Sequence, residues 1–145
     1  NYERQNSLVA RVIDAMEGNV VDKKIAVLGV AFKPNTDDIR EAPALVLIPQ
    51  LQAAGAKICA YDPIAMNNAA QVLKQIEWVE DVYEAAKDAD ALVIMTEWNE
   101  FRELDLIKAK SLLKSPKIVD CRNIFDPKEI KALGFEYDAV GRIIK

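Results

Sequence analysis

The sequence contains no histidine and only two cysteines, and both shortages narrow the chemistry available to it. Without histidine the chain lacks the commonest general base and the commonest metal ligand. Cys59 and Cys121 lie far apart and match no zinc-ligand pattern, so we expect no metal site. Such sparse use of cysteine is typical of free thiols in a reducing cytoplasm.

Long apolar runs and basic clusters are also missing. No apolar run approaches the roughly 18 residues of a membrane-spanning helix, and no signal peptide is visible, so we expect a cytoplasmic protein without a membrane partner. The net charge is −4 and no segment is strongly basic, which argues against a nucleic-acid partner. An anionic small ligand is still possible, because local cations decide whether such a ligand binds.

The residues that are present indicate one folded domain. Hydrophobic residues make up 51% of the 145-residue chain and charged residues 29%, enough for a core and too apolar for disorder. Apolar residues at helical spacing predict a helix over residues 3–17, before any strand. The remaining pattern predicts strands at 25–28, 57–61, 76–79, 91–95, 117–119 and 135–140, and helices at 43–54, 65–74, 82–87, 105–113 and 127–133.

Alternating strands and helices without tandem hairpins predict an α/β fold: a doubly wound, Rossmann-like parallel sheet with flanking helices, preceded by an N-terminal helix. Residues 24–43 are the most informative segment. Their pattern predicts a buried strand, a turn at Gly29, a polar loop and a helix that begins near Pro43. Dinucleotide-binding loops of this kind need three glycines, and here there is only Gly29. The loop instead offers Phe32 and Lys33, so we expect a different kind of ligand site.

The strand order expected for such a sheet is 3-2-1-4-5-6, with ligands bound at the carboxyl ends of the central strands. That order brings together Phe32-Lys33, Glu97-Trp98 and Arg122, each of which follows a different central strand. Two cations and two aromatic rings at one crevice suit a ligand with anionic phosphates, a flat base and sugar hydroxyls. The residues themselves thus predict an anionic, nucleotide-like ligand.

Each candidate residue also has a structural interpretation. Lys33 could be a solvated loop lysine, and Phe32 or Trp98 could simply pack in the core. Each arginine could form an ion pair with a carboxylate close to it in the sequence. Arg40 could pair with Asp37 or Glu41, and Arg122 with Asp120 or Asp126. Asp62, which follows the second strand, could bind ribose hydroxyls, although a turn or capping role is favoured.

Three segments carry a resemblance to a known family. They are residues 29–43 (GVAFKPNTDDIREAP), residues 96–101 (TEWNEF) and residues 120–123 (DCRN). In this order they resemble the C-terminal domain of the UDP-glucose/GDP-mannose dehydrogenase family, across about residues 20–142. The resemblance implies an NAD-dependent enzyme that oxidises the C6 hydroxyl of a nucleotide sugar to a carboxylate, with NAD bound mainly by an N-terminal domain.

The resemblance also implies roles for individual residues. Phe32, Lys33 and Arg122 are similar to residues that contact the nucleotide sugar, and Arg40 is similar to an arginine that reaches the cofactor. The family's catalytic residues lie upstream of this chain, so the resemblance places no catalytic residue in it. Cys121 stands where the family usually has glycine.

The resemblance further implies a domain organisation and partners. Residues 1–20 would be the tail of a central helical domain and residues 21–145 the domain that binds UDP-glucose or a related nucleotide sugar. The remaining domains of the same enzyme would be its partners, and the full-length enzyme would be a homo-oligomer. There are two alternatives to a domain that binds UDP-glucose. One is the corresponding domain of a GDP-mannose or UDP-N-acetylmannosamine dehydrogenase, and the other is a non-catalytic regulatory α/β module.

Overall fold

The computed structural model describes residues 2–140 and contains a six-stranded sheet in which every pair of neighbours is parallel. The strand order is β3-β2-β1-β4-β5-β6, as the sequence predicted. The strands are β1 (Lys24–Leu28), β2 (Lys57–Tyr61), β3 (Ile76–Trp78), β4 (Ala91–Ile94), β5 (Lys117–Asp120) and β6 (Glu136–Ala139). The order changes direction between β1 and β4, which is where doubly wound sheets bind ligands.

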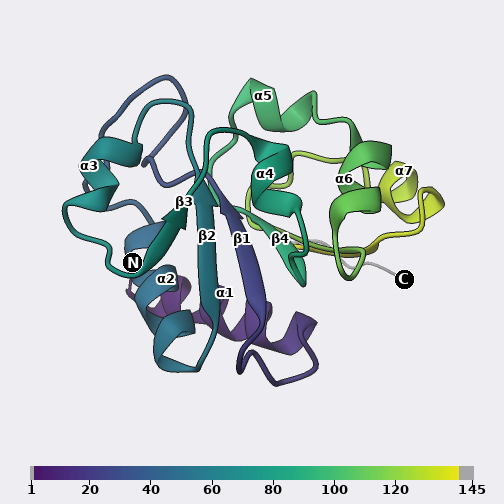
Figure 1. Cartoon of the computed structure of the whole chain (residues 1–145), viewed down its shortest axis with the longest axis horizontal. Helices are drawn as coiled ribbons and strands as arrows, with labels where there is room; N and C mark the ends of the chain where they lie inside the picture. The colour runs from purple at the N-terminus through teal and green to yellow at the C-terminus, as the bar shows by residue number, and fades with distance from the viewer. Residues whose placement is uncertain (1, 141–145) are drawn as a thin grey trace.

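Helices cover both faces of this sheet (Figure 1). They are α1 (Tyr2–Ala15), α2 (Ala44–Ala53), α3 (Met66–Ala70), α4 (Val82–Ala86), α5 (Asn99–Arg102), α6 (Leu106–Leu112) and α7 (Pro127–Ala132). Alternate residues of β1 face opposite layers: Ile25 and Val27 pack with α1 and α2, whereas Ala26 and Leu28 pack with α4, α6 and α7. Burial on both faces explains why the central strands are uninterrupted apolar runs.

The N-terminal helix α1 is part of this packing. Val9, Val12 and Met16 are buried in the same core cluster as the β1 residues Ile25 and Val27. The ammonium group of Lys117 at the start of β5 donates a hydrogen bond of 3.1 Å to the backbone oxygen of Ala15, near the end of α1. The helix therefore closes one face of the sheet.

Most predicted elements are confirmed, and the differences are local. The helix expected over 65–74 is shorter, since α3 ends at Ala70. The short helix α5 was not predicted, because it has four residues and Trp98 at its N-cap supplies no side-chain cap. Asp81 caps α4 by accepting a 2.8 Å hydrogen bond from the backbone nitrogen of Glu84. Within residues 2–140, no helix combines the length and apolar character needed to cross a membrane.

Candidate functional site

The turn after β1 is closed by tight contact with the end of β4. Gly29 has φ +95° and donates a 2.8 Å backbone hydrogen bond to Tyr61. A Cβ at this position would collide with Thr96, so glycine is needed both for the backbone angle and for the space. Thr96 is itself fully buried, and its hydroxyl donates a 2.9 Å hydrogen bond to the backbone oxygen of Ala31.

Asp62 holds the same turn from the end of β2. Its Oδ2 accepts hydrogen bonds from the backbone nitrogens of Val30 (2.9 Å) and Ala31 (3.2 Å). Its Oδ1 accepts from Ile64 (3.0 Å) and Ala65 (2.8 Å), which is a local turn of the chain around the carboxylate. The side chain is completely buried, so the ribose-binding hypothesis for Asp62 is wrong and the turn interpretation is confirmed.

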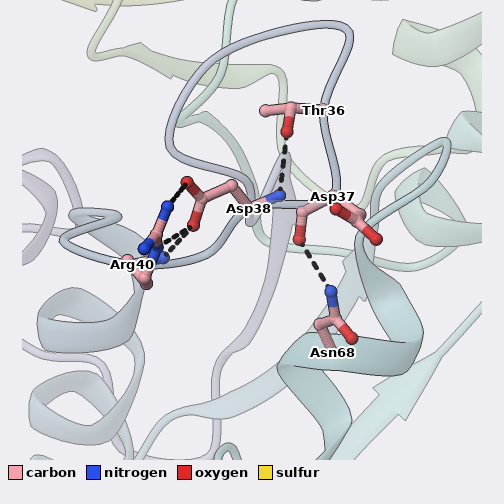
Figure 2. Close-up of polar contacts among 5 residues, drawn as sticks. All are labelled: Thr36, Asp37, Asp38, Arg40 and Asn68. Atoms are coloured by element: carbon pink, nitrogen blue, oxygen red, sulfur yellow. Dashed lines mark hydrogen bonds and ion pairs between the residues drawn. The ribbon is translucent and has the colours of Figure 1, made fainter.

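The rest of the loop folds back on itself between β1 and α2. The backbone nitrogen of Phe32 donates 2.8 Å to the backbone oxygen of Asp38, which closes the loop. Figure 2 shows Asn68 on α3 pointing up to the loop, where its amide donates 3.0 Å to the backbone oxygen of Asp37. The loop is thereby tied to α3 as well as to the strand ends.

Arg40 pairs within this loop with Asp38, and neither expected partner, Asp37 nor Glu41, is used (Figure 2). Its Nε and Nη2 donate 3.0 and 2.9 Å hydrogen bonds to the two carboxylate oxygens. The side-chain hydrogen bond from Arg40 is the main reason that the pKa of Asp38 falls to about 2. Because 87% of the Arg40 side chain is exposed, the guanidinium remains accessible to a further partner.

A second buried carboxylate, Asp120, organises the loop after β5. It accepts backbone hydrogen bonds from Arg122 (3.0 Å), Ile124 (2.8 Å) and Phe125 (3.2 Å), and a 2.6 Å hydrogen bond from the hydroxyl of Tyr137. Asp62 and Asp120 thus have the same structural role at the ends of β2 and β5. Each carboxylate anchors the backbone of a loop that carries a candidate ligand-binding residue.

The guanidinium of Arg122 pairs with Glu97, and neither of the expected partners, Asp120 and Asp126, is bonded to it. Its Nε and Nη2 donate 2.9 and 2.5 Å hydrogen bonds to the same carboxylate oxygen, Oε2. Asp120 contacts only the backbone nitrogen of Arg122. The sequence could have suggested Glu97, because it directly follows a central strand next to the one that leads to Arg122.

A cavity of about 520 Å³ opens at this edge of the sheet, on the side of α1 and α2. Most of its lining residues are apolar and come from α1 (Leu8), the start of α2 and the segments that follow β4 and β6. Its charged lining residues are Glu41 and Arg122. The sequence pattern did not predict Glu41 as a residue of this site. Its backbone adopts a left-handed φ of +59°, which is uncommon for a residue other than glycine or asparagine.

The structure brings some of the predicted site residues together and separates others. Phe32 and Arg122 line the same cavity, and Phe32 keeps 43% of its surface exposed. Lys33, the next residue of the same loop, is exposed and does not line the cavity. Trp98 is a core residue, 8% exposed, whose indole nitrogen donates 3.2 Å to Asp62. Its packing interpretation is therefore confirmed.

Neither cysteine is an activated nucleophile. Burial raises the pKa of Cys59 to about 12 and that of Cys121 to about 12, so both are neutral thiols near pH 7. Cys121 lines the cavity beside Arg122. Over the described residues, no cluster of histidine, cysteine and acidic side chains could hold a metal ion.

The fold and the cavity together define a class of protein: a doubly wound α/β domain with a cavity at the carboxyl edge of the sheet, the edge at which such domains bind their ligands. Residues 26–127 match the model of the UDP-glucose/GDP-mannose dehydrogenase family, UDP binding domain. The chain belongs to this family.

Individual relatives agree with this membership. The chain is 48% identical over 142 residues to a UDP-glucose 6-dehydrogenase of Rhizobium meliloti, covering 98% of this chain and 32% of that protein. Its fold is similar to that of a UDP-glucose dehydrogenase from Pyrobaculum islandicum (TM-score 0.79, 27% identity, 97% of this chain and 30% of that one). An NDP-N-acetyl-D-galactosaminuronic acid dehydrogenase from Methanosarcina mazei gives a TM-score of 0.80 at 27% identity, over 97% of this chain and 29% of that one. The chain therefore spans about a third of the length of the relatives it matches.

Proposed function

We propose that the chain is the nucleotide-sugar-binding domain of an NAD-dependent UDP-glucose 6-dehydrogenase, which oxidises the C6 hydroxyl of UDP-glucose to a carboxylate with two NAD. The observation that carries this proposal is that Phe32 and Arg122, far apart in the sequence, line one cavity at the carboxyl edge of the sheet. Lys33 lies on the same loop as Phe32 and is available to the phosphates. Membership of the family and the names of the relatives support UDP-glucose as the substrate.

NAD does not fit the loop after β1. A dinucleotide loop binds pyrophosphate through free backbone amides, but here the amides of Val30 and Ala31 already donate to Asp62. Asp62 is buried and cannot accept from a ribose. NAD would therefore bind mainly to a part of the enzyme outside this chain, with the exposed guanidinium of Arg40 reaching it from here.

The same proposal assigns the N-terminal segment and the cellular setting. Residues 1–20 would be the tail of a central helical domain, and residues 21–145 the UDP-sugar domain. The full-length enzyme would be a cytoplasmic homo-oligomer, and the two buried free thiols suit a reducing compartment. Catalytic groups would come from elsewhere in the enzyme, since both thiols of this chain have strongly raised pKa values.

Calorimetric titration of the 145-residue chain with UDP-glucose and UDP tests the proposal. Lys33→Ala should weaken binding by about ten- to a hundredfold, the value of a charge-assisted hydrogen bond, and leave the melting temperature nearly unchanged. Lys114→Ala, at another exposed lysine, is the matched control and should bind normally. Tighter binding of GDP-mannose or UDP-N-acetylmannosamine would reassign the substrate, and no binding of any nucleotide sugar would contradict the proposal.

A further inference from the structure

The ion pair between Glu97 and Arg122 leaves hydrogen-bonding groups open on both residues. Both hydrogen bonds use a single carboxylate oxygen, Oε2, which accepts from the Nε and the Nη2 of Arg122 at 2.9 and 2.5 Å. Among the described residues, Oε1 of Glu97 and Nη1 of Arg122 have no hydrogen-bond partner. The side chain of Glu97 is 24% exposed and that of Arg122 is 32% exposed, so part of each is open to solvent at the edge of the sheet.

Both members of the pair are held in place by their neighbours. Glu97 lies between Thr96, which is bonded to the oxygen of Ala31 at 2.9 Å, and Trp98, which is bonded to Asp62 at 3.2 Å. The backbone nitrogen of Arg122 donates 3.0 Å to the buried carboxylate of Asp120. A donor and an acceptor are thus fixed side by side before any ligand arrives, which favours directional recognition.

The charge of the pair disfavours a phosphate at this point. Glu97 already neutralises the guanidinium at hydrogen-bond distance, and a phosphate on Arg122 would approach the carboxylate as a like charge. Lys33, by contrast, is exposed on the neighbouring loop and makes no ion pair among the described residues. A hydroxyl group matches the pair better, because it can accept from Arg122 and donate to Glu97 at once.

We infer that Glu97 is a ligand-binding residue that, together with Arg122, recognises sugar hydroxyl groups of the nucleotide sugar while Lys33 takes the phosphates. This inference rests on the proposed function and adds the part of the ligand that each residue contacts. The hydroxyls can come from the ribose or from the attached sugar, because both present the same donor and acceptor chemistry.

Calorimetric titration of the 145-residue chain with UDP-glucose, UDP and pyrophosphate tests this division. Glu97→Gln keeps the shape but turns an amide donor toward the hydroxyl or toward Arg122, so UDP-glucose should bind about tenfold more weakly or worse. Pyrophosphate, which has no sugar hydroxyl, should bind as well as before or more tightly. If Glu97→Gln weakens the binding of UDP as much as that of UDP-glucose, Glu97 contacts the ribose hydroxyls. If its affinity for UDP is unchanged, Glu97 contacts the hydroxyls of the attached sugar.

Two further variants keep the test decisive. Glu97→Asp retains the charge but withdraws the acceptor by one methylene, and it should also lose UDP-glucose affinity. Glu103→Gln, which removes an exposed carboxylate six residues further along the chain, should bind as the wild type does. Wild-type UDP-glucose affinity in folded Glu97→Gln and Glu97→Asp, or an equal loss of pyrophosphate, overturns the inference alone. Failure of the wild-type chain to bind either nucleotide overturns the proposed function, and this inference with it.

Discussion

The indole nitrogen of Trp98 donates a 3.2 Å hydrogen bond to Oδ2 of Asp62, joining the ends of two strands that are not neighbours in the sheet. The same oxygen accepts from the backbone nitrogens of Val30 and Ala31. One buried carboxylate therefore connects the ends of β1, β2 and β4. It anchors the start of the loop that carries Phe32 and Lys33.

Asp62→Asn should unfold the chain more easily. The substituted amide would direct N–H groups at backbone donors, and each buried donor left without an acceptor costs about 1–3 kcal/mol, so we expect a total loss of about 2–4 kcal/mol. Urea denaturation measures the change. Asp88→Asn, at an exposed position with φ +59° that asparagine accepts readily, is the control and should be nearly neutral. Equal stability of the two variants would contradict the role of Asp62.

Gly29→Ala should be far more destabilising than Gly18→Ala. Both glycines have positive φ, +95° and +81°, so both substitutions strain the backbone by about 1–2 kcal/mol. Only at Gly29 would the new methyl group also collide with Thr96, whereas nothing lies within 4 Å of the corresponding position at Gly18. We expect Gly29→Ala to cost about 3 kcal/mol or more in urea denaturation. Similar losses in both variants would mean that backbone strain alone matters.

The pKa of Asp38 should depend on Arg40. In the folded chain this pKa is lowered from 3.8 to about 2, first by the side-chain hydrogen bond from Arg40 and then by the hydrogen bond from its backbone nitrogen. A lowered folded-state pKa stabilises the protein above the unfolded value, so the contribution is complete above about pH 4 and is lost as the pH falls toward about 2. Carbon-detected NMR titration of the Asp38 carboxyl should give a clearly higher pKa in Arg40→Ala, although the backbone nitrogen of residue 40 still donates to this carboxylate. An unchanged low pKa in that variant would assign the shift to another cause.

Neither cysteine should react in the native chain. Burial raises the pKa of Cys59 and of Cys121 to about 12, so little thiolate forms at pH 8. The colorimetric reagent DTNB should label no thiol in the folded chain and both thiols after denaturation. Rapid labelling of Cys121 in the native state, abolished by Cys121→Ser, would mean that the cavity exposes this thiol.

The chain by itself should not oxidise UDP-glucose. Its thiols are not activated, and the first two amides of the loop after Gly29, those of Val30 and Ala31, already donate to Asp62. Mixing the purified chain with UDP-glucose and NAD should give no increase in NADH absorbance at 340 nm. Sustained turnover, absent from a heat-denatured sample, would contradict this expectation.

The local pattern of apolar residues in the sequence was enough to predict the architecture. Uninterrupted apolar runs such as Ile25–Leu28 and Ala91–Ile94 predicted strands buried on both faces, and their alternation with helices predicted the parallel sheet and its order. These features depend on residues close together in the sequence. The convergence of Phe32 and Arg122 followed as well, because parallel strands end at one edge of the sheet.

Only the tertiary structure decided the partners of the charged groups. Sequence proximity suggested Asp37 or Glu41 for Arg40 and Asp120 or Asp126 for Arg122, whereas the folded chain uses Asp38 and Glu97. A long guanidinium side chain can reach several carboxylates, and which one it meets depends on loop conformations that distant groups impose. Asp62 fixes one of these loops through backbone donors that follow β1, and Asp120 is itself held by the hydroxyl of Tyr137 on β6. Such contacts between strands exist only once the sheet has formed.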